Sequence, residues 1–243
     1  MVDIHCHILP GIDDGAQDMA ESVQMARMAY DSGVTDIAVT PHFRGERESL
    51  DLIPVIEEGV LKLRKALFEE GIDINIHQGA EILCVAETPY LAEAGLLPTI
   101  GDSKYVLLEF YFDESLFFMN ECLGAISNAG YTPIVAHPER YDAVQRDSRT
   151  LIRWFREGYI LQLNKGSILG SLGRGAELVA DFMLDNGLAH LIASDAHSSE
   201  RRTPDMNGLR RYLSENIDGG YTRIILRDNP RRILKGKDVV PAS

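Results

Sequence analysis

Short hydrophobic runs alternate along the chain with longer segments in which hydrophobic residues recur every three or four positions. Seven of the short runs end in polar or turn residues, and they read VDIH, TDIAVTPH, IDINIHQGAE, YVLLEF, TPIVAHPE, YILQLNKGS and AHLIASDAH. Hydrophobic runs of this length, bounded by turn residues, are typical of strands that are buried in a sheet. The chain is therefore expected to contain seven main strands.

The segments between these runs have the spacing of helices that bury one face. The predicted helices cover residues 19–30, 51–70, 113–128, 148–157, 176–186 and 205–216. Asp18 is the predicted N-cap of the first helix, and Gly33 its C-terminal stop. From Tyr221 onward, the tail is expected to add a short strand and a closing helix.

Strands and helices that alternate throughout a chain predict βα units on a parallel sheet, and so an α/β fold. Seven strands without a glycine-rich dinucleotide-binding turn favour a closed barrel over an open sheet. No linker, tandem repeat or low-complexity tract interrupts the pattern. A single domain over residues 1–243 is therefore expected.

Composition and charge narrow the classes of partner. The 243 residues carry a formal net charge of −13, which argues against binding to nucleic acid or to anionic membrane surfaces. No hydrophobic run is long enough to span a membrane, and the first strand begins at Met1 or Val2, so no signal peptide and a cytoplasmic location are expected. Cys6, Cys84 and Cys122 have neither the number nor the spacing of a disulfide framework or a zinc ribbon.

Side chains that can bind metals follow nearly every predicted strand. His5 and His7 lie two residues apart, so on a strand both imidazoles point to one face. The C-terminal ends of parallel strands meet on one face of the fold, where the other candidates should join them. The full set is His5, His7, Asp14, His42, Glu81, Glu109, His137, Asp195 and His197.

Each of these residues taken alone also has a structural reading. His137 could cap a helix or lie in the core, and Glu109 could pair with a surface arginine. Five histidines and four carboxylates at one place are better explained by a polynuclear metal site, because buried carboxylates without cations are costly. His77 and His190 lie near the starts of their strands and are expected to be structural.

The motifs DIHCHILPGIDDGA, TPHF, GAEI, LLEF, AHPER and SDAH resemble those of one family. They are similar to the bacterial manganese-dependent tyrosine-protein phosphatases of capsule and exopolysaccharide systems, in the polymerase and histidinol phosphatase (PHP) superfamily. The similarity runs from residue 2 to about Pro230, and HILPGIDDG is its most specific part. The resemblance implies the PHP fold, a distorted seven-stranded (β/α) TIM-like barrel, and a trinuclear centre whose ligands are the nine residues above.

The resemblance also implies a reaction, the hydrolysis of phosphotyrosine in proteins by in-line attack of a metal-bridging hydroxide on phosphorus. Three divalent cations would outweigh the charge of the four carboxylates, so the pocket would favour a phosphate anion. Manganese is the expected metal, with iron or zinc as alternatives. His42 and Asp14 are expected to serve catalysis as well as the metals.

Two arginines are expected to bind the phosphate. Arg140 follows His137 by three residues and Arg202 follows His197 by five, which places both at the mouth of the site. Because Arg201 is adjacent to Arg202, either of them could be the second phosphate-binding arginine. Lys165 is a weaker candidate for a phosphate contact. The implied substrate is the phosphorylated tail of a membrane-bound bacterial tyrosine autokinase that controls polysaccharide synthesis, and the phosphatase itself is not expected to insert into the membrane. The sequence leaves open whether the chain forms a homo-oligomer.

Other chemistries fit the sequence less well. Cysteine phosphatases need C-x5-R, but Ile12, Tyr90 and Asn128 stand six residues after the three cysteines. The alternative within the superfamily is a histidinol-phosphate phosphatase of histidine biosynthesis. A metal-dependent amidohydrolase and a non-catalytic PHP scaffold are further alternatives.

Overall fold

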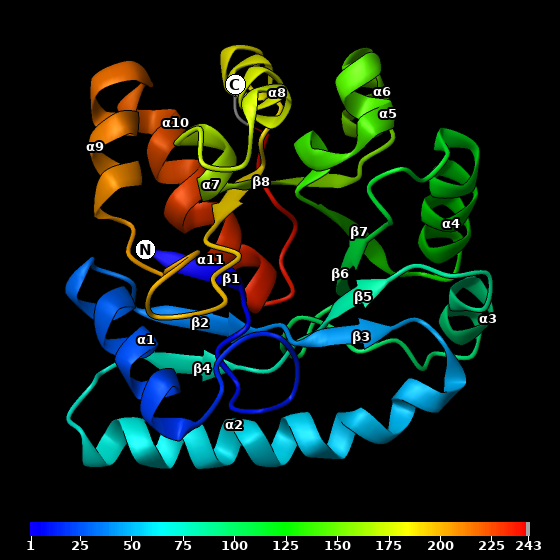
Figure 1. Cartoon of the computed structure of the whole chain (residues 1–243). Coiled ribbons are helices and arrows are strands. Elements are labelled where there is room, and N and C mark those ends of the chain that lie inside the picture. Colours follow the sequence, from blue (N-terminus) through cyan, green and yellow to red (C-terminus); the bar gives the residue numbers. More distant parts are fainter. Residues whose placement is uncertain (242–243) are drawn as a thin grey trace.

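The computed structural model describes residues 1–241, so the last two residues of the expected domain lie outside the described part. Its strands run through the middle of the molecule and helices surround them (Figure 1). The strands are β1 (Val2–Cys6), β2 (Asp36–Val39), β3 (His42–Arg44), β4 (Asn75–His77), β5 (Glu81–Leu83), β6 (Tyr105–Glu109), β7 (Thr132–Ala136), β8 (Ile160–Asn164) and β9 (Leu191–Ala193). They form two sheets, β1-β2-β4 and β3-β5-β6-β7-β8-β9, in which every pairing is parallel.

Two of the predicted strands are each broken into two. The run at 35–42 becomes β2 and β3, separated by Thr40 and Pro41, and the run at 72–81 becomes β4 and β5. Pro41 has no N–H to donate to a neighbouring strand. At Gly79, a Cβ would lie 2.7 Å from the Ile100 side chain, so this break is packed too closely for a larger residue. The first halves, β2 and β4, join the sheet of β1, whereas the second halves, β3 and β5, join the sheet of β6.

The two sheets meet again at the other side of the molecule. An isolated parallel bridge between Cys6 and Ala196 joins the end of β1 to the segment after β9. Within residues 1–241 the strand pairing does not close into a continuous ring. The α/β class with parallel strands is confirmed, and the closed seven-stranded barrel is not.

The six predicted helices are confirmed to within a few residues at each end. Asp18 caps the first one as expected, with its Oδ1 accepting a hydrogen bond from the Glu21 N–H at 2.9 Å, and Gly33 follows its end with φ of +92°. The longer helices are α1 (Met19–Asp31), α2 (Leu52–Glu69), α4 (Leu116–Asn128), α6 (Arg149–Arg156), α8 (Arg174–Asp185) and α9 (Asn207–Asn216). Short helices that the sequence did not predict are α3 (Thr88–Glu93), α5 (Asp142–Arg146), α7 (Lys165–Ile168), and the turns η1 (Arg47–Asp51) and η2 (Pro138–Arg140).

The short strand predicted in the C-terminal tail is wrong. The segment is helical, with α10 (Gly219–Arg223), a π-helical stretch η3 (Ile224–Asp228) and α11 (Asn229–Leu234) in succession. Ile225, Asn229 and Ile233 are buried, and their spacing of four residues is that of one helix face. The two adjacent isoleucines of the tail suggested a strand because short hydrophobic runs do not distinguish the two structures.

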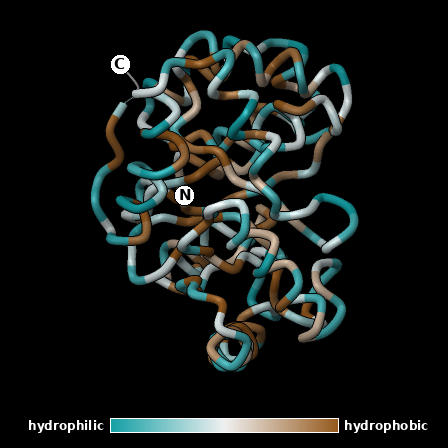
Figure 2. Tube along the Cα trace, turned by 90° about the vertical axis from the view of Figure 1, so that its left-hand side faces the viewer, coloured by the Kyte–Doolittle hydropathy of each residue, from teal (hydrophilic) through white to brown (hydrophobic). Residues whose placement is uncertain are grey.

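Buried side chains on both faces of the strands form two cores. On β6, Tyr105 and Leu107 belong to a core enclosed by the strands, whereas Val106 and Leu108 pack toward the helices. Figure 2 shows the hydrophobic segments mostly in the interior and hydrophilic ones at the outer turns. Strands buried on both faces explain the nearly continuous hydrophobic runs in the sequence.

The inner faces of the strands change from apolar to polar along the chain direction. On β8, Ile160 lies in the enclosed core, Gln162 reaches the His5 imidazole, and Asn164 reaches Asp195. The apolar core thus fills one end of the enclosed space and leaves the other end for polar chemistry. Of the helices in residues 1–241, none combines the length and the hydrophobicity that crossing a membrane requires.

Candidate metal centre

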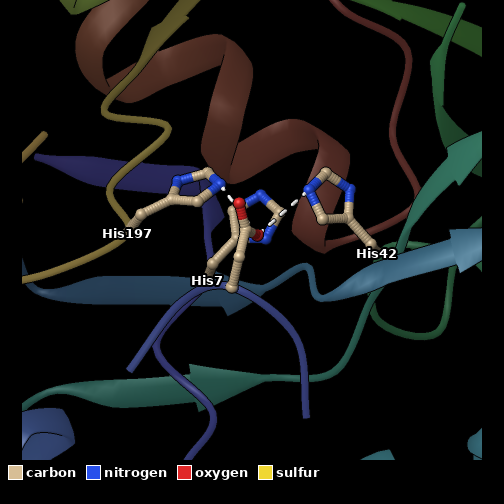
Figure 3. A group of neighbouring side chains, drawn as sticks. His7, His42 and His197 are labelled. Carbon is tan, nitrogen blue, oxygen red and sulfur yellow. Dashed lines mark ion pairs between the residues drawn. The ribbon is translucent and has the colours of Figure 1, made fainter. Parts of the chain in front are cut away.

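The structure brings all nine predicted ligand residues together where the parallel strands end. His5 lies on β1 and His7 directly after it, and their Nε2 atoms are 3.2 Å apart. Figure 3 shows the imidazoles of His7, His42 and His197 gathered around one space. His42 and Glu81 were predicted to end their strands. Instead they begin β3 and β5, directly after the two strand breaks, and they are register partners there.

The ligand atoms form overlapping groups, each compact enough to surround a single ion. Within each group the nitrogen and oxygen atoms all lie within 4.8 Å of one another. The groups are His7–Asp14–His42–His197, His5–His7–Glu81, His5–His137–Asp195 and His42–Glu81–Glu109. Because several residues belong to two groups, the groups share side chains and form one continuous cluster of candidate ligands.

Two further residues orient the first pair of imidazoles. Nδ1–H of His5 donates to Oε1 of Gln162 at 2.9 Å, and Nδ1–H of His7 donates to a carboxylate oxygen of Asp13 at 2.7 Å. Both hydrogen bonds direct the Nε2 atoms into the cluster, where they lie 3.1 and 3.2 Å from Glu81 oxygens. Imidazoles that ligate metals are commonly held in this way by a second layer of acceptors.

The Asp195 carboxylate connects the ligands to the arginines. Its Oδ2 accepts hydrogen bonds from Asn164 at 2.6 Å and from Arg140 at 3.3 Å, and it also pairs with Arg202. Its Oδ1 is buried, has no hydrogen-bond partner, and lies 3.4 Å from Nε2 of His5. An oxygen that is buried without a donor and aimed into a group of imidazoles is suited to a cation.

The carboxylates change the ionisation of the imidazoles strongly. Burial alone would lower the pKa of His5, but Glu81 and Asp195 raise it to about 10. Burial also opposes protonation of His42, whereas the hydrogen bond to Glu109 and the charge of Glu81 raise its pKa to about 9. Without metal, therefore, protons on the imidazoles balance the carboxylates. Divalent cations would supply the same positive charge, and the imidazole and carboxylate donors suit manganese, iron or zinc.

Backbone strain is concentrated at this centre. In the described part of the chain, His137, Asp195 and Arg202 are the non-glycine residues with positive φ, at +34°, +49° and +50°. Such conformations cost L-residues energy and occur mainly where the surrounding structure enforces them. All three residues belong to the predicted site, so the strain marks the turns that direct its side chains inward.

The structure distinguishes among the predicted phosphate-binding residues. Arg140 and Arg202 both line a cavity of about 230 Å³ over the ligand cluster, and Arg201 does not. Lys165 is buried, its ammonium donates to the carbonyl oxygens of Thr203 and Asp205, and the residue lines a neighbouring cavity of about 450 Å³ instead. Of the two arginines in the second motif, Arg202 is the one that faces the ligands.

Phe112 is a residue of this cavity that the sequence analysis did not identify. Its ring lies 4.5 Å from the Arg140 guanidinium and 6.2 Å from the His137 ring, and 46% of the residue is exposed. Asp13, Gln162 and Asn164 were also missed. The last two carry a signal in the sequence, since polar residues two positions apart interrupt an otherwise hydrophobic strand.

The residues expected to be structural lie apart from the cluster. His77 pairs with Asp36 at 3.2 Å, and the buried His190 accepts a hydrogen bond from the Leu161 N–H through Nδ1. All three cysteines are free and buried.

Comparisons with known proteins agree with one another. Residues 1–235 match the family model described as capsular polysaccharide synthesis, CpsB/CapC. The chain is 32% identical over 240 residues to the tyrosine-protein phosphatase YwqE of Bacillus subtilis, covering 98% of this chain and 93% of the relative. It is 31% identical over 240 residues to the tyrosine-protein phosphatase CpsB of Streptococcus pneumoniae, covering 96% and 98%.

Solved structures give the same result. One chain from the crystal structures of YwqE and CpsB, described as unique metal-dependent tyrosine phosphatases, superposes with a TM-score of 0.87 at 29% identity, covering 99% of this chain and 97% of that one. A lactonase from Listeria monocytogenes superposes with a TM-score of 0.61 at 13% identity, covering 97% and 94%, which is a likeness of fold alone.

Metal binding should release protons. At pH 7 the His5 and His42 imidazoles are protonated in the metal-free protein, because their pKa values are about 10 and about 9. Titration of Mn²⁺ into chelator-treated protein should therefore release about two protons, and the affinity should rise between pH 7 and pH 9. Calorimetry in buffers of different ionisation enthalpy measures the number released. Binding that releases no protons at pH 7 would contradict this account of the charge balance.

Asp13 should contribute to metal affinity without being a ligand. Burial opposes ionisation of Asp13, but the hydrogen bond and charge of His7 lower its pKa to about 2, so the carboxylate is charged at neutral pH. The substitution Asp13→Asn removes this charge, which orients the His7 imidazole. We expect an affinity for Mn²⁺ that is lower by about 10- to 100-fold, measured by competition with a fluorescent chelator. Asp73→Asn, at an exposed carboxylate, is the matched control; equal affinities in the two variants would show that Asp13 has no such role.

Proposed function

The chain belongs to the CpsB/CapC family of capsular polysaccharide synthesis, and on that basis we propose that it is a metal-dependent phosphatase that hydrolyses phosphotyrosine in proteins. The resemblance to the tyrosine phosphatases of capsule systems is thus confirmed for the family. The observation that carries the proposal is the convergence of nine metal-binding side chains and two arginines on one cavity.

We propose that the nine residues hold three divalent cations, manganese before iron or zinc. The overlapping groups of donors and the unpartnered Asp195 oxygen support this assignment. Divalent cations in such a centre lower the pKa of bound water and neutralise charge on a phosphoryl group. Asp14, the most exposed carboxylate of the set, and His42 border the cavity, so both are placed to contact the reacting groups as well as the ions.

The two arginines are assigned to the phosphate. Both guanidiniums contact Asp195 from the cavity side, and a planar guanidinium can donate two parallel hydrogen bonds to phosphate oxygens. The two arginines line the same cavity as seven of the nine ligand residues. A phosphate monoester bound there would meet positive charge from both directions.

The aromatic ring of the substrate is assigned to Phe112. Its side chain borders the same cavity and packs against Arg140, so it offers an apolar wall beside the phosphate-binding group. A phenol ring can pack against such a wall, whereas the short side chain of phosphoserine would not reach it. Phe112 therefore favours aryl over alkyl phosphates.

The proposed physiological substrate is the phosphorylated tail of a tyrosine kinase that takes part in capsule or exopolysaccharide synthesis. The names of the relatives, which are tyrosine-protein phosphatases of capsule systems, support this choice. We also propose that the protein acts in the cytoplasm and that the chain forms one domain. Histidinol-phosphate hydrolysis is not favoured, because the relatives that match over nearly the whole chain are tyrosine phosphatases.

We also interpret the two sheets as one distorted seven-stranded barrel of the PHP type. The strand order around the molecule follows the chain if β2–β3 and β4–β5 are each counted as one strand. The Cys6–Ala196 bridge then stands at the seam between the first and last strands. In this interpretation the strand breaks are what bring His42 and Glu81 to the centre.

A paired assay tests the proposed activity. The protein should lose activity after treatment with chelator, regain it with Mn²⁺, and hydrolyse a phosphotyrosyl peptide at least about tenfold faster than histidinol phosphate, expressed as kcat/KM. A preference for histidinol phosphate would assign the same metal chemistry to histidine biosynthesis. Activity on neither substrate would favour the amidohydrolase or scaffold alternatives.

Phe112 and Arg140 should affect selectivity differently. Phe112→Ala should lower kcat/KM for a phosphotyrosyl peptide about tenfold more than for a phosphoseryl peptide, since only the aryl group packs on the ring. Arg140→Lys should lower both by a similar factor, because the phosphate is common to both substrates. If Phe112→Ala and Arg140→Lys changed the ratio of kcat/KM for the phosphotyrosyl peptide to kcat/KM for the phosphoseryl peptide equally, Phe112 would not be part of an aryl-binding site.

A further inference from the structure

A second cavity, away from the metal centre, is lined by arginines. It has a volume of about 590 Å³ and lies between α9 and the C-terminal segment formed by α10 and η3, which are neighbours in Figure 1. Arg210 and Arg211 come from α9, and Arg223 and Arg227 from the other wall. Among the described residues that line it there is no carboxylate. We call this cavity the arginine groove.

The arginines lie on the two helix faces that border the groove. Positions 207, 210, 211 and 214 of α9 line it, as do 219, 222, 223, 226 and 227 of the opposite wall, and both series have the spacing of one helix face. Two adjacent helices would ordinarily bury apolar residues on such faces. Here four arginines line the two faces instead, in a protein whose formal net charge is −13.

The described carboxylates near the groove leave most of this charge unbalanced. Asp228 pairs with Arg223 at 3.0 Å. Arg210 donates to the neutral Ser32 carbonyl oxygen at 3.2 Å, and the Asp218 carboxylate caps α10 by accepting from the N–H groups of Gly220 and Tyr221. One ion pair among four arginines therefore leaves a net positive groove.

Two further features of the groove wall indicate a binding site. The Oγ1 of Thr222 is buried and has no hydrogen-bond partner, although Thr222 lines the groove. The wall also contains the π-helical stretch η3, which includes Leu226 and Arg227. π-Helical turns are rare and occur frequently at functional sites.

We propose that the arginine groove binds a small anion that carries a diphosphate group. Guanidiniums on two facing walls can each donate paired hydrogen bonds to phosphate oxygens, and the volume exceeds what a single phosphate would occupy. The diphosphate can be inorganic pyrophosphate or the diphosphate of a nucleotide. A long nucleic acid is disfavoured, because the net charge of the whole protein would repel it.

The groove is distinct from the metal centre. Met1 lines the groove, whereas His5 lies four residues further along the same extended segment. At about 3.3 Å per residue, the two sites are separated by roughly 13 Å along β1. Binding at one site can therefore be measured separately from binding at the other.

Hydrogen exchange localises the binding. The metal-loaded full-length protein is incubated with pyrophosphate or with ADP, and amide protection is measured along the chain. We expect protection of residues 207–230 in the wild type and in the control Arg149→Gln/Arg156→Gln, which removes two exposed arginines at α6. Arg211→Gln/Arg227→Gln should weaken this protection, with an apparent affinity lower by at least about tenfold.

Each result bears on the proposal. Similar protection by both ligands indicates that the diphosphate alone is recognised, and stronger protection by ADP indicates that the nucleoside contributes; both support it. Arg211→Lys/Arg227→Lys, which keeps the charge but loses the paired donors, should bind with intermediate affinity, and its unfolding temperature controls for misfolding. No protection of 207–230 by either ligand, protection that the glutamine variant retains, or protection by a phosphotyrosyl peptide alone would overturn it.

Discussion

The repulsion among buried carboxylates constrains the whole centre. Glu81 and Asp195 are almost completely buried, and each would be costly there without positive charge. Nε2 of His5 lies within 3.4 Å of an oxygen of each, so one imidazole interacts with both negative charges. The same contacts lower the pKa values of both carboxyls against the effect of burial. The surrounding fold must therefore hold imidazoles, arginines and carboxylates in fixed positions, whether protons or metal ions complete the balance.

The fold meets this requirement by separating two tasks along each strand. The apolar inner residues near the strand starts, such as Ile160, fill the enclosed core, and the polar residues near the strand ends, such as Asn164, form the site. Rigid parallel strands support the ligands better than mobile loops would. The breaks at Pro41 and Gly79 extend this arrangement. The strand that follows each break begins with a candidate ligand, His42 on β3 and Glu81 on β5. Irregularity in the sheets is thus part of how the centre is assembled.

The sequence predicted the site better than it predicted the sheet. Ligand residues are recognisable because their chemistry is unusual at the end of a hydrophobic run, and all nine converge as expected. The breaks within 35–42 and 72–81 were missed because each run was interpreted as one strand that ends in its ligand, although Pro41 and Gly79 are residues that interrupt strands. In the tail, the closing helix was predicted but a short strand was expected where the chain is already helical, because the burial of Ile225 and Ile233 depends on contacts with the distant strands β9 and β1. Phe112 carries no signal in the sequence, since a single aromatic residue after a strand is common.

Local positive charge in an acidic protein has a consequence for both cavities. A net charge of −13 repels anions over most of the surface, so an anionic ligand gains most where guanidiniums or cations reverse the sign. Arg140 and Arg202 do so at the metal centre, and four arginines do so at the groove. Because interactions between exposed charges are screened within about 10 Å at 0.1 M salt, neither cavity strongly influences the other through solvent. Selectivity then rests on what lines each cavity: Phe112 beside the arginines at one, and facing arginines without metal ligands at the other.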